Sequence, residues 1–160
     1  MKPVSAVQRG RPLLCLLILA VAAAMAACSQ PLTVEQQIVT VIRDMEARIE
    51  EGERRPFMAH VSENFSGQDS LGNRDQLNAM ILYQLNRHKR VQAKLFGIRV
   101  TPTAEGEAEA YFRVLLTGGE GWLPESGQMY SMVTTWREEE DDWKLVSARW
   151  KPVVIEVPLE

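Results

Sequence analysis

Residues 91–117 read VQAKLFGIRVTPTAEGEAEAYFRVLLT, and this stretch decides the fold class. From Glu107 to Thr117 apolar and polar side chains alternate, and the apolar positions are Ala108, Ala110, Phe112, Val114 and Leu116. A period of two predicts a β-strand with one buried face. Residues 91–100 alternate in the same way but change parity at Phe96-Gly97, which predicts a β-bulge or a sharp bend.

Two more strands are expected towards the C-terminus. The strand 128–137 places a common set of side chains on one face, namely Tyr130, Met132, Thr134 and Trp136. An acidic turn, residues 138–142, leads to a last strand at 143–151. Strict alternation puts Trp143 and Trp150 on opposite faces of this strand. Large apolar groups are therefore expected on both faces of the sheet, and an exposed apolar face usually marks an interface.

Helices are predicted ahead of these strands. Thr33-Val34-Glu35-Gln36 and Asn73-Arg74-Asp75-Gln76 each read as a capping box that opens a helix. The first helix carries the apolar stripe Ile38, Val41, Ile42, Met45 and Ile49, and the later one carries Leu77, Ile81 and Leu85. A short helix at 57–63 is expected after Pro56. The pattern predicts an α+β domain with three N-terminal helices packed on a curved, mostly antiparallel sheet.

The N-terminus has the three-part form of a secretory signal. Lys2, Arg9 and Arg11 precede an apolar run that ends at Ala27, directly before Cys28. The alternatives are an ordinary signal peptide cut after Ala27, and a membrane anchor, although about 15 apolar residues fall short of the roughly 20 that span a bilayer. We expect residues 1–27 to be a removed signal, 28–32 a lipidated tether, 33–151 the domain and 152–160 a tail.

Met25-Ala26-Ala27-Cys28 resembles the bacterial lipobox, with Met in place of the commoner Leu. The resemblance implies lipid attachment at Cys28, which would hold the protein to a membrane. In the sorting rule of Gram-negative lipoproteins, Asp at the second mature position retains the protein in the inner membrane. Ser29 stands at that position here, so the resemblance implies the periplasmic face of the outer membrane.

The charge balance and the cysteine count exclude several classes of function. Removal of residues 1–27 takes three of the 18 lysines and arginines and none of the 21 acidic residues, which leaves a net charge of about −6. Such an acidic domain is not expected to bind nucleic acid, or to have a basic patch for anionic lipid. With Cys15 removed and Cys28 acylated, no thiol remains for a disulfide or a nucleophile. His60 and His88 lack partners at metal-ligand spacing, so no metal site is expected.

Three segments resemble the nuclear transport factor 2-like superfamily, which includes the SnoaL-like proteins. They are Asn64-Phe65-Ser66-Gly67, Gly106-Glu107-Ala108-Glu109-Ala110, and Trp143-Lys144-Leu145-Val146 with Trp150. The turn before Trp143 departs from the family's usual Asp-Gly. The resemblance implies a cone-shaped domain that encloses a pocket, and a possible homodimer through the outer face of the sheet. No cofactor is expected.

Enzymes of this superfamily use a carboxylate in the pocket as a base, and Asp69 is the nearest candidate here. Asp69 reads equally well as part of a solvated turn, so we expect it to lie outside the pocket. Tyr130, Trp136 and Arg113 are the candidate binding residues for a small hydrophobic ligand. The preferred reading is a non-catalytic module that binds a small molecule or a protein. The alternatives are a small isomerase, dehydratase or cyclase, and a structural subunit of an envelope assembly.

Overall fold

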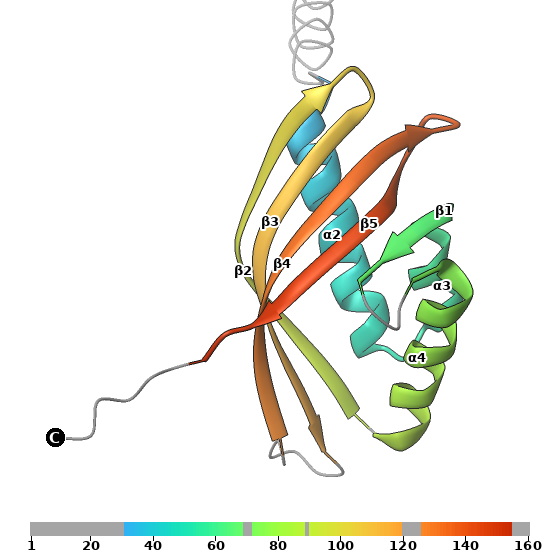
Figure 1. Ribbon diagram of the computed structural model, residues 1–160, viewed down its shortest axis with the longest axis vertical. Coiled ribbons are helices and arrows are strands. Elements are labelled where there is room, and N and C mark those ends of the chain that lie inside the picture. Colours follow the sequence, from blue (N-terminus) through green and yellow to red (C-terminus); the bar gives the residue numbers. More distant parts are fainter. Residues whose placement is uncertain (1–30, 69–71, 89, 120–125, 155–160) are drawn as a thin grey trace, which may run out of the picture. The chain divides into compact units, whose positions relative to one another are not determined.

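A computed structural model describes residues 31–68, 72–88, 90–119 and 126–154 (Figure 1). The chain from Thr33 onward forms one compact unit, and the residues up to Leu32 belong to another. The buried hydrophobic core of the unit that starts at Thr33 is formed by side chains between Ile38 and Ala148. This domain therefore has a core of its own. The predicted signal and Cys28 lie outside the described residues. No helix within the described ranges is long and apolar enough to cross a membrane.

The two long helices begin where the capping boxes predict. α2 spans Val34–Glu50, and α4 spans Arg74–Arg87. Both halves of each box are formed, because Thr33 and Asn73 accept from the N3 backbone N–H while the N3 glutamine side chain accepts from the cap N–H. Beyond the C-cap of α2, Gly52 adopts φ +74°, a left-handed conformation that glycine tolerates best.

The prediction of a helix at 57–63 is wrong in its second half. α3 spans Arg54–Ala59, and strand β1 follows at Val61–Gly67. β1 pairs in parallel with the last strand, where Val61 lies opposite Leu145, and the Leu145 N–H donates to the His60 carbonyl at 2.8 Å. Pairing with a strand that is distant in the sequence outweighs local helix propensity here. β1 therefore stands between α3 and α4, and the helices do not all precede the sheet.

The sheet has five strands in the order β1-β5-β4-β3-β2. β2 spans Arg90–Ala104, β3 Glu107–Gly119, β4 Ser126–Glu139 and β5 Asp142–Pro152, and these four strands are antiparallel neighbours. The predicted irregularity at Phe96-Gly97 is confirmed, because the β2–β3 register shifts there and Gly97 has φ +63°. The α+β class and the mostly antiparallel sheet are also confirmed, with α2, α3 and α4 on one side of a curved sheet (Figure 1).

A second register shift corrects the predicted placement of the tryptophans. Trp136 lies opposite Leu145, but Thr135 lies opposite Ser147, so β5 holds one extra residue at Val146. The extra residue reverses the alternation along β5. Trp143 is buried and Trp150 packs against the same core, so both lie on the helix-covered face. The expectation that Trp143 and Trp150 lie on opposite faces is therefore wrong.

β2 is an edge strand, and α2 covers its free side with two carboxylates. Glu50 Oε1 accepts a hydrogen bond from the Ala93 N–H at 3.2 Å, and Glu46 Oε1 accepts one from the Leu95 N–H at 3.2 Å. Unpaired backbone groups on a sheet edge can template another strand. These two contacts satisfy two backbone donors of the free edge and fix α2 along the sheet.

Candidate functional site

A cavity of about 800 Å³ lies between the helices and the inner face of the sheet. Its walls are mostly aliphatic, aromatic and thioether side chains. The helices contribute Ile42, Met45, Ile49, Phe57, Leu77, Met80, Ile81 and Leu85, and the strands contribute Phe65, Val91, Ala93, Leu95, Phe112, Val114, Leu116, Tyr130, Met132, Trp136, Ala148 and Trp150. The size is within the range of pockets that bind small molecules in proteins.

Trp136 forms part of the wall and is almost wholly buried, with 1% of its surface exposed. Its indole N–H donates to Thr134 Oγ1 at 2.9 Å, and the Thr134 hydroxyl donates to the Ala110 carbonyl at 3.2 Å. The indole therefore has its polar partner within the protein. It offers an apolar ring to the cavity and no free donor.

Apart from Glu46, the hydrogen-bonding side chains of the lining come from neighbouring segments at one end of the pocket. The end of α4 contributes Gln84 and His88, and the adjoining ends of β3 and β4 contribute Thr117, Gln128 and Tyr130. The His88 ring lies against β3 at Gly118, where a Cβ would come within 3.2 Å of the ring. Neither the Tyr130 hydroxyl nor the His88 ring hydrogen-bonds to any other described residue. This end can therefore offer donors and acceptors to a ligand.

Glu46 is the acidic residue among the described lining residues, and its carboxylate is already engaged. One oxygen accepts from the Leu95 N–H, and the other lies 2.8 Å from Arg43 Nη1. No lysine or arginine belongs to the lining in the described part of the chain. Glu46 therefore has a structural role, and the described lining offers no lysine or arginine to pair with an anionic ligand.

The predicted site residues have different outcomes. Tyr130 and Trp136 both line the cavity, while their role in binding stays a prediction. The placement of Arg113 is wrong, because it alternates with the lining residues Phe112 and Val114 and is exposed on the opposite face of β3. Asp69 lies outside the described residues, as does Cys28.

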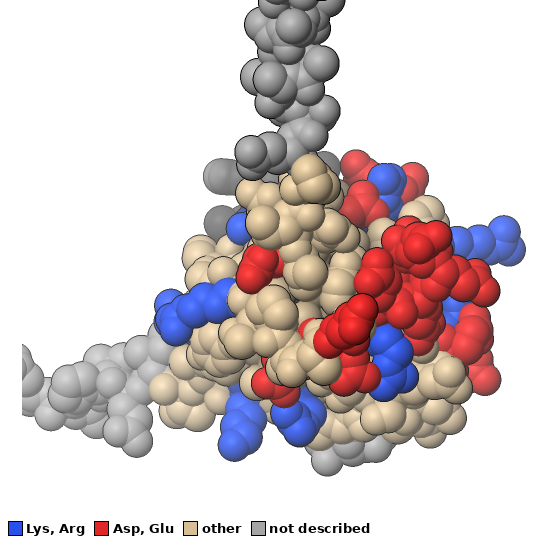
Figure 2. Space-filling model, turned by 90° about the horizontal axis from the view of Figure 1, so that it is seen from above, with Lys and Arg blue, Asp and Glu red and all other residues tan. Residues whose placement is uncertain are grey.

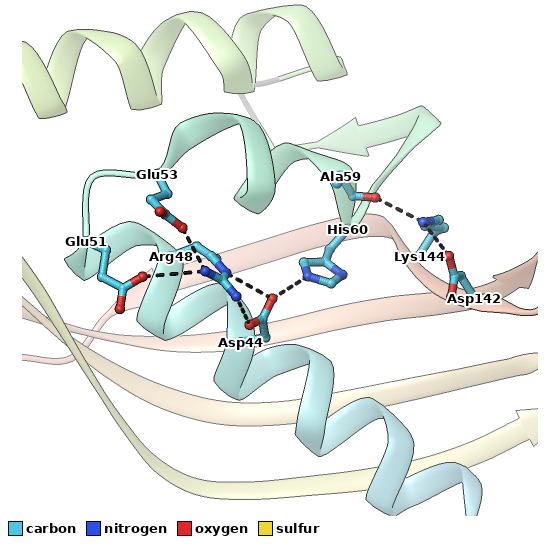
Figure 3. Close-up of polar contacts among 8 residues, drawn as sticks. All are labelled: Asp44, Arg48, Glu51, Glu53, Ala59, His60, Asp142 and Lys144. Carbon is cyan, nitrogen blue, oxygen red and sulfur yellow. Dashed lines mark hydrogen bonds and ion pairs between the residues drawn. The ribbon is translucent and has the colours of Figure 1, made fainter.

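A separate polar cluster joins α2 to the end of α3 (Figure 3). His60 Nε2 lies 2.7 Å from Asp44 Oδ2, and Arg48 bridges Asp44 at 3.0 Å and Glu53 at 2.7 Å. The hydrogen bond from His60, followed by the one from Arg48, lowers the pKa of Asp44 below its ordinary value. None of these residues lines the cavity, so the cluster acts as a clamp between two helices.

The described residues contain no group of three or more histidine, cysteine or acidic side chains arranged to hold a metal ion. Sequence reasoning missed Gln84, His88 and Glu46 as lining residues. A signal was available for the first two, because Gln84 and His88 extend the helical spacing of Leu77 and Ile81. They were missed because the helical stripe was defined by apolar side chains alone, and both residues are polar.

Solved structures share this architecture at low sequence identity. The Bdellovibrio bacteriovorus protein Bd1075 matches with a TM-score of 0.65 and 8% identity over 74% of this chain, but the match spans 41% of Bd1075. A "putative dehydratase from the NTF2-like family" of Streptomyces avermitilis matches with a TM-score of 0.66 and 18% identity, over 75% of this chain and 96% of that one. An NTF2-like protein of unknown function from Pseudomonas putida matches with a TM-score of 0.64 and 14% identity, over 76% and 89%.

No protein-family model matches the sequence, and no curated protein sequence matches it either. The structural matches define the fold alone. The domain has the nuclear transport factor 2-like fold, as the sequence resemblance predicted.

Proposed function

We propose that this protein is a periplasmic lipoprotein whose domain binds a small apolar molecule in the cone, without catalysis. The observation that carries the proposal is the cavity of about 800 Å³, whose mostly apolar lining has a few hydrogen-bonding side chains at one end. Pockets of this kind gain affinity from apolar contact and orient the ligand through a few polar groups. The absence of lysine and arginine from the described lining favours a ligand without a negative charge and with one hydrogen-bonding end.

The location at the membrane is part of the same proposal. It rests on the signal-like N-terminus and on Cys28 within its lipobox-like segment. Two or more acyl chains at one cysteine would provide stable anchoring, since each buried methylene contributes roughly 0.8 kcal/mol. A small apolar ligand that leaves or enters a bilayer would then meet the pocket close to the membrane.

Two further candidate functions remain. A dehydratase, isomerase or cyclase is favoured by the His88 ring and the Tyr130 hydroxyl, which line the same cavity and have no other described partner. Histidine and tyrosine are both competent general acid–base groups. The third candidate, a structural subunit of an envelope assembly, would use the surface of the domain and leave the cavity unoccupied.

The binding proposal is tested with Nile red, a neutral apolar dye whose fluorescence rises in apolar surroundings. We expect the chain to bind it, and Met80→Trp to weaken binding at least about tenfold because the larger ring enters the cavity. Leu82→Trp is the matched control, since Leu82 is 46% exposed on the same helix and is not a lining residue. Equal binding by both variants would refute ligand binding in the cone.

Native mass spectrometry of the protein purified from its own cells separates the candidates. A co-purified small molecule that is absent from Met80→Trp supports the binding module. Turnover of the recovered molecule, lost in His88→Ala or Tyr130→Phe, would instead favour an enzyme. A co-purified protein in place of a small molecule would favour the structural subunit.

A further inference from the structure

The outer face of the sheet, opposite the pocket, carries cations around exposed aromatic rings. The cross-strand register places its residues in two neighbouring rows, Phe96–Arg113–Ser131–Lys151 and Arg99–Tyr111–Val133–Arg149. We call these residues the basic outer face. Phe96 is 43% exposed and Tyr111 is 40% exposed, so two aromatic rings of this face are open to solvent.

The cations of this face are mostly not neutralised. Arg113 and Lys151 form no ion pair with any described residue, and Arg99 stacks over the Tyr111 ring at 5.9 Å. Arg149 has a weak contact with Glu109, at 3.6 Å. The expectation that the domain lacks a basic patch is therefore wrong, because the sheet gathers cations that the sequence spreads over 53 positions, from Arg99 to Lys151.

Glu107 and Glu109 share the outward parity of Tyr111 on β3, but a larger group of acidic side chains gathers elsewhere. Figure 2 shows acidic side chains crowded on one side of the molecule, the side on which the β4–β5 turn lies in Figure 1. The acidic run from Glu138 to Asp142 forms this turn and the strand ends beside it. The separation gives the domain a charge asymmetry, although acidic residues outnumber basic ones in the whole chain. An anionic surface would attract the basic outer face and repel the acidic side. A second copy docked face to face would instead bring cations against cations.

We propose that the basic outer face docks the domain on an anionic phospholipid surface. Each lysine or arginine close to such a surface strengthens binding by about fivefold, and exposed aromatic rings suit the interface between headgroups and acyl chains. The lipid anchor of the proposed function would assist this docking. The stretch from Cys28 to Thr33 reaches at most roughly 17 Å when extended, so the anchor would hold the domain close to the membrane. The docking itself depends on charges of the folded domain.

Two tyrosines provide the test. The full chain is incorporated into phosphatidylcholine vesicles with or without one third phosphatidylglycerol, and nitration of each tyrosine by tetranitromethane is followed by peptide mass spectrometry. We expect anionic vesicles to slow nitration of Tyr111 at least about fivefold, with reversal by high salt. Tyr83, 56% exposed on α4, should react equally on both kinds of vesicle. Arg113→Glu and Lys151→Glu should each abolish the protection, whereas the matched control Arg55→Glu, an exposed change on α3, should not.

Each other outcome overturns a definite part of the reasoning. Equal Tyr111 nitration on both kinds of vesicle would refute docking. Protection that depends on protein concentration and not on anionic lipid would also refute it, and would assign the face to a second copy. Vesicle flotation distinguishes attachment through the lipid anchor from docking through the basic outer face. Flotation with anionic vesicles alone, lost in Arg113→Glu, would support docking and refute the lipid anchor, and no flotation with either kind would refute both.

Discussion

Replacement of Glu50 by alanine should lower the free energy of unfolding by about 2 kcal/mol and expose the edge of β2. The carboxylate accepts from the Ala93 N–H at 3.2 Å and from Lys94 Nζ at 3.0 Å. Loss of a charged acceptor for a backbone donor costs about 1.5–3 kcal/mol. The exposed ion pair with Lys94 adds up to about 1 kcal/mol, while the higher helix propensity of alanine returns about 0.4 kcal/mol.

The measurement is urea denaturation combined with hydrogen exchange at the Ala93 amide. We expect the amide to exchange faster in Glu50→Ala, and Glu50→Gln to lose about half as much stability because it retains an acceptor. Glu51→Ala is the control on the same chain segment. The Glu51 carboxylate forms a 3.5 Å contact with Arg48 and is 59% exposed, so its loss should cost less than about 0.5 kcal/mol. Equal stability of the Glu50→Ala and Glu51→Ala variants, with unchanged exchange at Ala93, would show that α2 does not cover the strand edge.

Four further predictions concern the core, the clamp between α2 and α3, and the residues Cys28 and Asp69. Phe112→Ala should cost about 3 kcal/mol in urea denaturation, near the lower end for a buried phenylalanine because its ring already borders a cavity; a loss below about 1 kcal/mol would contradict its burial. The pKa of Asp44 is lower in the folded protein than in the unfolded chain, so its contribution to stability is present above the ordinary carboxyl pKa and is lost as pH falls through the folded value. In Asp44→Asn the melting temperature should therefore decrease less as the pH is lowered. The same decrease in the variant and in the unchanged protein would contradict the role of Asp44 in the clamp. Cys28→Ala should abolish incorporation of labelled palmitate, and continued labelling would refute the lipoprotein proposal. Asp69→Asn should leave Nile red affinity unchanged, whereas a severalfold change would place this carboxylate in the pocket.

Much of the fold could be predicted because its signals are local. The capping boxes at Thr33 and Asn73 depend on residues three positions apart, and the structure forms both as the sequence predicts. The bend at Gly97 was visible as a change of parity within one strand. Errors arose where a distant partner decided the conformation. The chain after Ala59 becomes β1 because it pairs with β5, some eighty residues later in the sequence.

The candidate site was predictable only in part. Tyr130 and Trp136 share the parity of a strand whose inner face is apolar, and both line the cavity. Arg113 was offered as a polar handle, but strand alternation turns it away from Phe112 and out of the pocket. His88 was considered as a metal ligand, yet its ring lies against Gly118 beside the cavity. No sequence pattern indicates that contact, because it joins the end of α4 to the end of β3.

The sequence by itself determined the α+β class, the helix starts and the alternation of the long strands, because each follows from the steric and hydrogen-bonding preferences of neighbouring residues. Only the tertiary structure decided which face of each strand contributes to the common core. One extra residue at Val146 reverses the parity of β5 and brings Trp143 and Trp150 to a common face. The same cross-strand pairing gathers Arg99, Arg113 and Lys151 into one surface, since neighbouring strands lie only about 5 Å apart however distant their residues are in the sequence.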